Sequence, residues 1–155
     1  MVLPAEVLKT HSMEGEKSGI FIYNNSRGLI EDCDIFENGF AGVEVTDGGN
    51  PILRNCSVYD GKSAGFNIHD NGAAVIHNCR IHGNALEGIY FAKGSKGEVK
   101  GCQINRNGSW AIGLDENSTA AVEECNLMDN GKGAWSIDTT CQVNKKANID
   151  EETKL

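Results

Sequence analysis

The sequence predicts an all-β protein that folds as a right-handed parallel β-helix, a solenoid of about five to six coils with three short strands per coil. The first observation is a 23-residue unit that repeats without insertion. The units begin at Gly19, Gly42, Gly65, Gly88, Ala111 and Ala134. The second is that apolar and polar residues alternate within each unit, as they do in β-strands. The third is that glycine, asparagine and aspartate separate the alternating stretches, which is typical of turns.

Aligning the units reveals rows of similar residues. Positions 2, 4, 12 and 17 of the unit are apolar in each of the first five units, as in Val43, Val45, Leu53 and Val58 of the second. Position 15 is always cysteine in those units: Cys33, Cys56, Cys79, Cys102 and Cys125. Position 20 is asparagine in four of five: Asn38, Asn84, Asn107 and Asn130, with Gly61 in the second unit. We expect all six rows to face the core.

The strands are expected at positions 2–4, 10–12 and 15–17, which are residues 43–45, 51–53 and 56–58 in the second unit. One unit cannot bury its apolar face alone, but stacked coils can, with each strand pairing in parallel with its copy in the next unit. Crossovers between parallel strands are almost always right-handed. The asparagine row is expected to hydrogen-bond along the axis and to occupy a left-handed turn.

A leucine-rich repeat is the alternative, because part of the unit imitates its consensus. The second half of the unit disfavours it, since Val43-Glu44-Val45 and a Gly/Asn/Asp turn stand where that family has a helix or 3₁₀ segment. We divide the chain into an N-terminal cover or degenerate coil (1–18), the β-helix repeats (19–143) and a polar C-terminal tail or cap (144–155).

Two stretches, NSRGLIEDCDIF (residues 25–36) and NPILRN (50–55), resemble the parallel β-helix repeats of F-box ubiquitin-ligase substrate receptors. The resemblance covers about residues 19–137 and implies coils that hold protein substrates. The wider superfamily with this repeat includes carbohydrate-binding proteins and sugar hydrolases. The sequence has no F-box-like helical segment, so the resemblance does not extend to ligase recruitment.

The charge balance disfavours two classes of partner. Acidic residues outnumber basic ones by 22 to 14, for a formal charge of −8. Nucleic acid and anionic membranes are therefore not expected partners, because a surface that follows phosphates needs the opposite sign. No apolar stretch approaches the roughly 18 residues of a membrane-spanning helix, and the first 17 residues do not resemble a secretory signal.

The cysteine row favours reduced thiols. Its members should stand about 4.8 Å apart along the stack, farther than the Cβ separation of a disulfide. Cys141 lies off the row and is expected to be free. A line of thiols does not converge on a metal ion, so we expect no metal and no cofactor. Together these features predict an intracellular, cytoplasmic protein.

The outward face of the first strands is the expected binding surface, because aromatic residues on a rigid strand platform are good anchors. Its members are Phe21, Tyr23, Glu44, Asn67, His69, Tyr90, Trp110 and Asp115. We expect a non-catalytic binding or scaffold module that recognises another protein, possibly within a larger assembly. A carbohydrate-binding or polysaccharide-cleaving β-helix remains the alternative, with a glycan as ligand.

Catalysis is less favoured on the same face. Asp115 and Asp138 are expected about 5 Å apart, close to the spacing of a retaining glycosidase pair. No arginine falls on these rows, however, and Asp138 lies where the repeat pattern fades. We therefore assign no catalytic residue, and an enzymatic role stays open without being favoured.

Overall fold

The computed structural model describes residues 17–151, which form sixteen strands and no helix. The first sheet holds, in spatial order, β1 (Ile20–Ile22), β4 (Val43–Val45), β7 (Phe66–Ile68), β10 (Ile89–Phe91), β13 (Trp110–Leu114) and β15 (Gly133–Ile137). The second holds β2 (Arg27–Glu31), β5 (Asn50–Arg54), β8 (Ala73–His77), β11 (Lys96–Lys100), β14 (Thr119–Glu123) and β16 (Gln142–Lys146). The third holds β3 (Asp34–Phe36), β6 (Ser57–Tyr59), β9 (Arg80–His82) and β12 (Gln103–Asn105).

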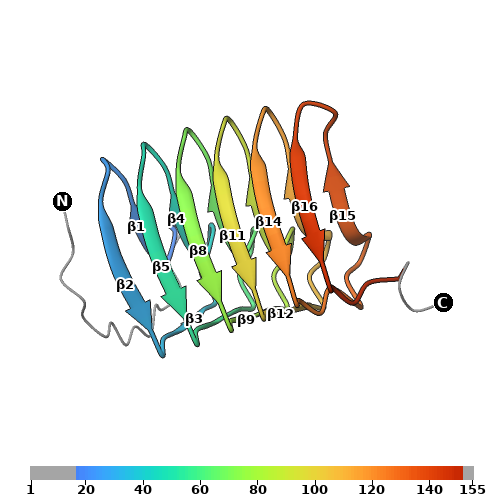
Figure 1. The fold of residues 1–155 in the computed structure, drawn as a ribbon. Coiled ribbons are helices and arrows are strands. Elements are labelled where there is room, and N and C mark those ends of the chain that lie inside the picture. The colour runs from blue at the N-terminus through green and yellow to red at the C-terminus, as the bar shows by residue number, and fades with distance from the viewer. Residues whose placement is uncertain (1–16, 152–155) are drawn as a thin grey trace.

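Successive coils lie side by side along one axis, so the colour in Figure 1 runs evenly from one end of the stack to the other. All strand pairs are parallel and join residues 23 apart, as in Val43 with Phe66 and Val99 with Val122. The predicted fold is therefore confirmed. The second strand is longer than expected and the third begins one residue later, because the cysteine stands in the bend before it. The predicted N-terminal cover lies outside the described residues except for Lys17 and Ser18.

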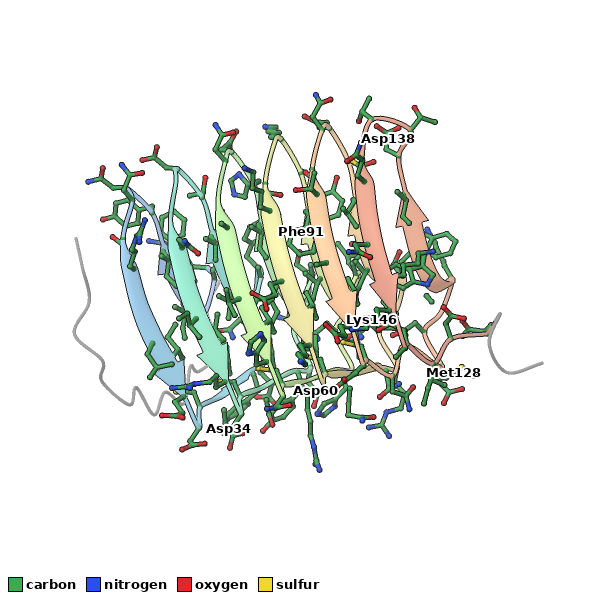
Figure 2. The ribbon with its side chains drawn as sticks, in the orientation of Figure 1. Asp34, Asp60, Phe91, Met128, Asp138 and Lys146 are labelled. Carbon is green, nitrogen blue, oxygen red and sulfur yellow. The ribbon has the colours of Figure 1, made fainter. Side chains whose placement is uncertain are left out.

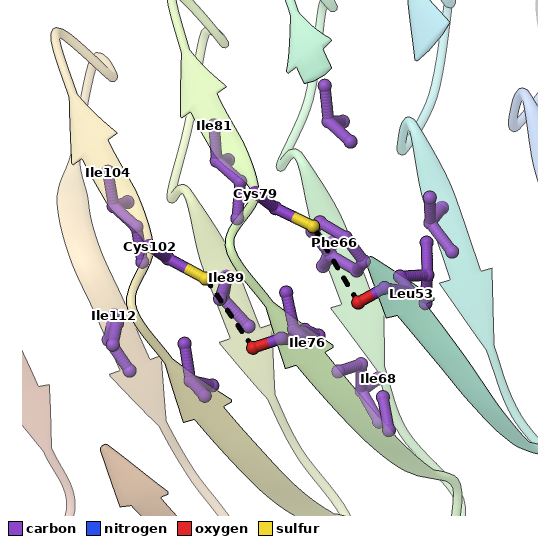
Figure 3. Packing of buried hydrophobic residues seen from close by; sticks show 14 of the residues in the cluster. Leu53, Phe66, Ile68, Ile76, Cys79, Ile81, Ile89, Cys102, Ile104 and Ile112 are labelled. Carbon is purple, nitrogen blue, oxygen red and sulfur yellow. Dashed lines mark hydrogen bonds between the residues drawn. The ribbon is translucent and has the colours of Figure 1, made fainter. Parts of the chain in front are cut away.

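The core is a continuous column inside the three sheets (Figure 3). All five predicted apolar rows are fully buried in the inner coils, including Phe66, Ile76, Cys79 and Ile81. Burial weakens at the last coil, where Ile137 is 38% exposed. The alternation of the sequence thus places the inward residues correctly wherever a coil has neighbours on both sides.

Small residues form a further inward row that the apolar pattern did not reveal. Position 10 of the unit contributes Pro51, Ala74 and Ala120, all buried, at the centre of the second sheet. Position 8 contributes Ser95 and Ser118, whose hydroxyl oxygens lie 3.2 Å apart. Alanine, proline and serine carry too little apolar surface to stand out in a hydrophobicity pattern, although they fill the narrow parts of the coil.

The asparagine row forms a buried hydrogen-bonded ladder. Asn84 Nδ2 donates to Asn107 Oδ1 at 3.0 Å, and Asn107 Nδ2 donates to Asn130 Oδ1 at 3.0 Å. The expected left-handed conformation is found one residue earlier, at Asp60 (φ 54°) and Arg106 (φ 56°). The preceding residue therefore makes the turn, which leaves the asparagine side chain directed into the core.

Gly61 interrupts this ladder. It provides no side-chain acceptor for the coil before it, and Asn38 Nδ2 is buried without a hydrogen-bond partner among the described residues. The Gly61 amide still donates to Asn84 Oδ1 at 3.2 Å. The unpaired amide of Asn38 is thus a consequence of the missing side chain in the next coil.

Gly61→Asn is expected to raise the free energy of unfolding by about 1 kcal/mol, through new hydrogen bonds and a less flexible unfolded chain. The new Cβ would lie 3.2 Å from Asn84 Oδ1, and φ at this position is not positive, so the side chain needs only a small adjustment. Urea unfolding of both proteins measures the change. Gly61→Ala is the control, because it adds the Cβ without the amide; equal effects of the two variants would contradict completion of the ladder.

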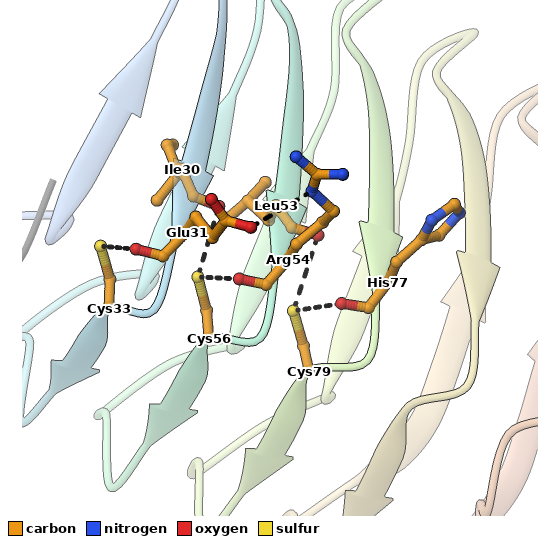
Figure 4. A network of polar contacts seen from close by, with 8 residues as sticks. All are labelled: Ile30, Glu31, Cys33, Leu53, Arg54, Cys56, His77 and Cys79. Atoms are coloured by element: carbon orange, nitrogen blue, oxygen red, sulfur yellow. Dashed lines mark hydrogen bonds and ion pairs between the residues drawn. The ribbon is translucent and has the colours of Figure 1, made fainter. Parts of the chain in front are cut away.

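The cysteine ladder is held by carbonyl groups (Figure 4). Cys79 Sγ lies 3.4 Å from the His77 carbonyl oxygen and 3.8 Å from that of Leu53 in the preceding coil. Cys56 repeats this arrangement, and all six cysteines are free. Hydrogen bonding to Cys79 together with burial raises the pKa of Cys56, which favours the neutral thiol. The row is thus a packed, hydrogen-bonded part of the core.

The last coil continues past residue 143, where the sequence pattern fades. β16 runs to Lys146 and pairs with β14. Asn148 then takes the cysteine position: its Oδ1 accepts from the Cys125 amide at 3.0 Å, and its Nδ2 donates to the Val122 carbonyl at 2.8 Å. Trp135 closes this end of the core, with Nε1 donating to the buried Asp150 at 2.9 Å. Polar side chains that bond to the previous coil thus replace the apolar rows.

Candidate functional site

The outward side of the first sheet, called here the first-sheet face, carries the predicted binding residues in two rows. Phe21, Glu44, Asn67 and Tyr90 are consecutive partners across β1, β4, β7 and β10. Tyr23, His69 and Asp115 follow two residues later in their coils, next to the turn that leads to the second sheet. The repeat therefore places these residues on one surface, but their side-chain contacts divide them into separate groups.

The most exposed group is an aromatic pair in the first coil. The rings of Phe21 and Tyr23 stack with centroids 5.0 Å apart and planes inclined by 24°, and each residue is 53% exposed. A depression of about 450 Å³ lies beside Phe21 and is also lined by Lys17, Ser18, Phe40 and Glu44. Phe40 and Ser18 were not predicted, because both lie outside the first strand of a coil. The pair offers a flat apolar surface that no described residue covers.

The second group is an acid–histidine cluster formed by Ser18, Glu44, His69 and Asp70. His69 Nε2 lies 2.9 Å from Glu44 Oε1, and its Nδ1 lies 2.6 Å from Asp70 Oδ2. Ser18 Oγ donates to the other Glu44 oxygen at 2.8 Å. Hydrogen bonding to His69 holds the pKa of Asp70 below its usual value. The cluster places two carboxylates around one imidazole, so this part of the face is acidic.

Asp70 is a member of this cluster that the predicted set omitted. Its position next to His69, at the first residue of a turn, is a signal that could have found it. The left-handed φ of 46° at Asp70 belongs to that turn.

Tyr90 and Asp115 form the third group. The Tyr90 hydroxyl donates to Asp115 Oδ2 at 2.7 Å across neighbouring coils. Burial, and then the hydrogen bond to Asp115, raises the pKa of Tyr90, so the phenol stays protonated. Tyr90 is therefore fixed against the sheet as a hydrogen-bonded wall of the face.

Trp110 lies apart from the aromatic pair. It begins β13 and pairs with Gly133, and a Cβ on that glycine would come within 3.1 Å of the indole ring. It stands about four coils from the level of Phe21, or roughly 19 Å along the axis at the usual strand spacing. The structure thus places Trp110 against Gly133 of the last first-sheet strand, and the predicted aromatic residues do not form one cluster.

The two aspartates considered for catalysis each bind a neighbour. Asp115 accepts from Tyr90, and Asp138 accepts from the Thr140 hydroxyl at 2.5 Å. The Thr140 hydroxyl and amide also lower the pKa of Asp138. Both carboxylates are therefore engaged in local contacts at the edge of the face.

Residues 17–151 have no group of three or more histidine, cysteine or acidic side chains arranged to hold a metal ion. They also have no helix long and apolar enough to span a membrane.

Comparisons with known proteins identify the fold family. The family model described as a right-handed β-helix region matches residues 6–149. None of the curated proteins compared with the chain matches it in sequence. The chain is similar in structure to the periplasmic alginate epimerase AlgG, with a TM-score of 0.65 and 13% identity over 85% of this chain and 43% of that chain. A point mutant of AlgG gives a TM-score of 0.70 at 15% identity, with 85% and 42% covered.

The chain thus spans less than half of the AlgG chains, and at this identity the likeness concerns the fold alone. The family match supports the predicted β-helix and carries no information on F-box substrate receptors or on one carbohydrate-binding family. On the evidence of the 23-residue coils and the match over residues 6–149, the chain belongs to the right-handed β-helix family.

Proposed function

We propose that this protein is a binding module that recognises an extended, positively charged protein segment along the first-sheet face. The observation that carries the proposal is the order of aromatic and acidic side chains along that face. An exposed aromatic pair stands at one end, and four of the next five coils contribute carboxylates, the fourth coil being the exception. They are Glu44, Asp115 and Asp138, with Asp47, Asp70 and Glu116 at the adjoining turns.

Charge complementarity favours a basic partner. At positions 3, 5 and 6 of the unit, the described coils have one lysine or arginine, Lys93 in the adjoining turn, and Lys17 lies near Glu44 at the aromatic end. Lysine and arginine side chains pair with carboxylates and also pack on the faces of aromatic rings. The face offers both a carboxylate and aromatic rings, since Glu44 and Phe21 line one depression and Tyr23 stacks on Phe21. Six strands span about 24 Å, which suits roughly seven residues of extended chain.

A glycan is the second candidate for the same face. The stacked rings of Phe21 and Tyr23 could pack on a sugar, and the structural likeness to alginate epimerases makes this class relevant. The excess of carboxylates favours an uncharged or cationic glycan over an acidic one. The two candidates therefore share anchor residues and differ in ligand.

Binding of nine-residue peptides is the test, with lysine/arginine-rich, uncharged and aspartate/glutamate-rich sequences compared by fluorescence polarisation. We expect the basic peptides to bind most tightly and to weaken as NaCl rises from about 50 to 300 mM, since the exposed charges are screened. The Phe21→Ala/Tyr23→Ala variant should bind at least about tenfold more weakly, as expected for interface anchors.

Asp34→Asn is the matched control, because Asp34 is an exposed carboxylate on the third sheet. It should leave affinity unchanged, and the melting temperature of each variant should match that of the parent. Equal affinity for acidic and basic peptides, or full binding by the aromatic double variant, would refute the proposal. Neutral oligosaccharides that bind in place of peptides and depend on Phe21 and Tyr23 would establish the second candidate instead.

A further inference from the structure

The third sheet carries an aromatic ladder on its outward side. Phe36, Tyr59 and His82 occupy the same position in three successive coils. The Phe36 and Tyr59 rings lie 5.3 Å apart with planes inclined by 13°, and the Tyr59 and His82 rings lie 5.0 Å apart and are parallel within 3°. Each ring thus presents one face to the coil before it and the other to the coil after it.

The ladder ends at His82, because the next coil has Asn105 at this position. The Asn105 amide is directed away from the imidazole: its Nδ2 donates to the Met128 carbonyl at 2.8 Å and to Asn126 Oδ1 at 3.3 Å, both in the following coil. A depression of about 410 Å³ lies at this place and is lined by Arg80, His82, Gln103, Asn105 and Arg106. The second face of His82 therefore borders an open site.

The charge of this depression is positive, although the protein as a whole is acidic. Neither Arg80 nor Arg106 forms an ion pair with a carboxylate within residues 17–151. Burial, and then the charge of Arg106, lowers the pKa of His82. Asp60, labelled in Figure 2, directly follows the third-sheet strand β6 and opposes this effect. Its influence on the pKa of His82 is smaller than that of Arg106. Two guanidinium groups thus stand beside a neutral imidazole.

We propose that the depression binds an aromatic carboxylate. The aromatic ring would stack on the open face of His82 and so extend the ladder by one member, in the offset parallel arrangement that aromatic pairs favour. The carboxylate would accept hydrogen bonds from Arg80 and Arg106, because a guanidinium fork matches carboxylate geometry. Gln103 would contact a polar substituent of the ring. The volume suits one small ligand and lies within the range of small-molecule sites.

An acidic sugar would satisfy the arginines equally well but would not continue a stack of parallel aromatic planes. A neutral aromatic molecule would stack but would leave both guanidinium groups without an anion. The combination of ring ladder and unpaired arginines therefore favours a ligand with both features. This site lies on the third sheet, so it is independent of the peptide binding proposed for the first-sheet face.

Four probes separate these features: benzoate, cyclohexanecarboxylate, benzamide and glucuronate. Amide chemical-shift titrations of the full chain should show benzoate perturbing residues 80–83 and 103–106 and no other surface to the same extent. Cyclohexanecarboxylate, which lacks the aromatic plane, and benzamide, which lacks the charge, should each bind at least about fivefold more weakly. Glucuronate binding as tightly as benzoate would overturn the proposal in favour of an acidic sugar, and benzoate perturbations centred elsewhere would overturn the site.

Variants then test the named residues. Arg80→Gln/Arg106→Gln should weaken benzoate binding about tenfold while leaving benzamide binding unchanged. His82→Asn places in the third coil the residue found at this position in the fourth, so the fold is retained, and it should weaken benzoate but not cyclohexanecarboxylate. Arg54→Gln on the second sheet is the control. A loss of benzoate binding with Arg54→Gln equal to that of the double variant would show a nonspecific charge effect and refute the assignment.

Discussion

Replacing Asn107 with leucine is expected to lower the free energy of unfolding by about 3 kcal/mol, because buried groups lose their hydrogen-bond partners. Asn107 Oδ1 accepts from the backbone N–H of Asn84 at 3.2 Å and from the side-chain Nδ2 of Asn84 at 3.0 Å. Its Nδ2 donates to the Ile81 carbonyl at 3.1 Å and to Asn130 Oδ1 at 3.0 Å. Leucine has a similar volume but satisfies none of these groups, so the change removes hydrogen bonds from both adjacent coils.

Thermal and urea unfolding measure this loss. For a chain of this size, 3 kcal/mol corresponds to a melting temperature lowered by roughly 6–12 °C. Asn38→Leu is the matched control, because Asn38 lies in the same row and is equally buried but its Nδ2 has no partner among the described residues. The control should therefore lose clearly less stability. Equal losses would show that the asparagine row stabilises the protein by packing and not through its hydrogen-bonded ladder.

The repeat itself made most of the fold predictable. A unit of constant length allows one register only, so the pairing of Val43 with Phe66 and of Val99 with Val122 follows from the 23-residue spacing. The alternation then assigns each side chain to the inside or the outside. The repeat length and the alternation can both be read directly from the sequence, so the sheets and the inward rows could be predicted without any tertiary information.

The end of the stack was less predictable, because residues there form polar contacts at positions where the inner coils have apolar packing. Asn148 stands at the cysteine position and binds backbone groups of the previous coil with its amide. Asp150 is buried and accepts from Trp135. A polar sequence ordinarily suggests a solvated tail, and only the neighbouring coil reveals that these polar groups have partners.

In the candidate sites, too, the repeat predicted the position of a residue but not its contacts. Row positions placed Glu44 and His69 on one face, but the contact between them depends on side-chain conformation and on Asp70 in the following turn. The third-sheet ladder was not predicted: Phe36, Tyr59 and His82 share a position of the unit, but Asn105 and Met128 at the same position in the next two coils interrupt its aromatic character. Sequence periodicity thus gives the face on which a residue lies, while the local contacts determine what the residue can bind.

Gly97→Ala is expected to destabilise the protein by about 3 kcal/mol, at the upper end of the usual cost of overpacking a core. A Cβ at Gly97 would lie 2.3 Å from both Cε1 and Cζ of Phe91. Phe91 is fully buried, and its partners in the neighbouring strands are Ile68 and Leu114, so a shift of its ring would disturb the packed core. Within the fourth coil, the large side chain of Phe91 on the first sheet therefore occupies the space left by Gly97 on the second.

The third coil shows how the same space can be filled differently, with Ile68 and Ala74 at the positions equivalent to Phe91 and Gly97. Phe91→Ile alone should cost about 1–3 kcal/mol by leaving a cavity next to Gly97. The double variant Phe91→Ile/Gly97→Ala reproduces the combination of the third coil and should recover the loss caused by Gly97→Ala, with a coupling energy of about 3 kcal/mol in a double-mutant cycle. Urea unfolding of all four proteins gives this value. Additive losses would mean that the two positions do not share one volume, whereas recovery would establish that each coil adjusts its own pair of residues to one fixed cross-section.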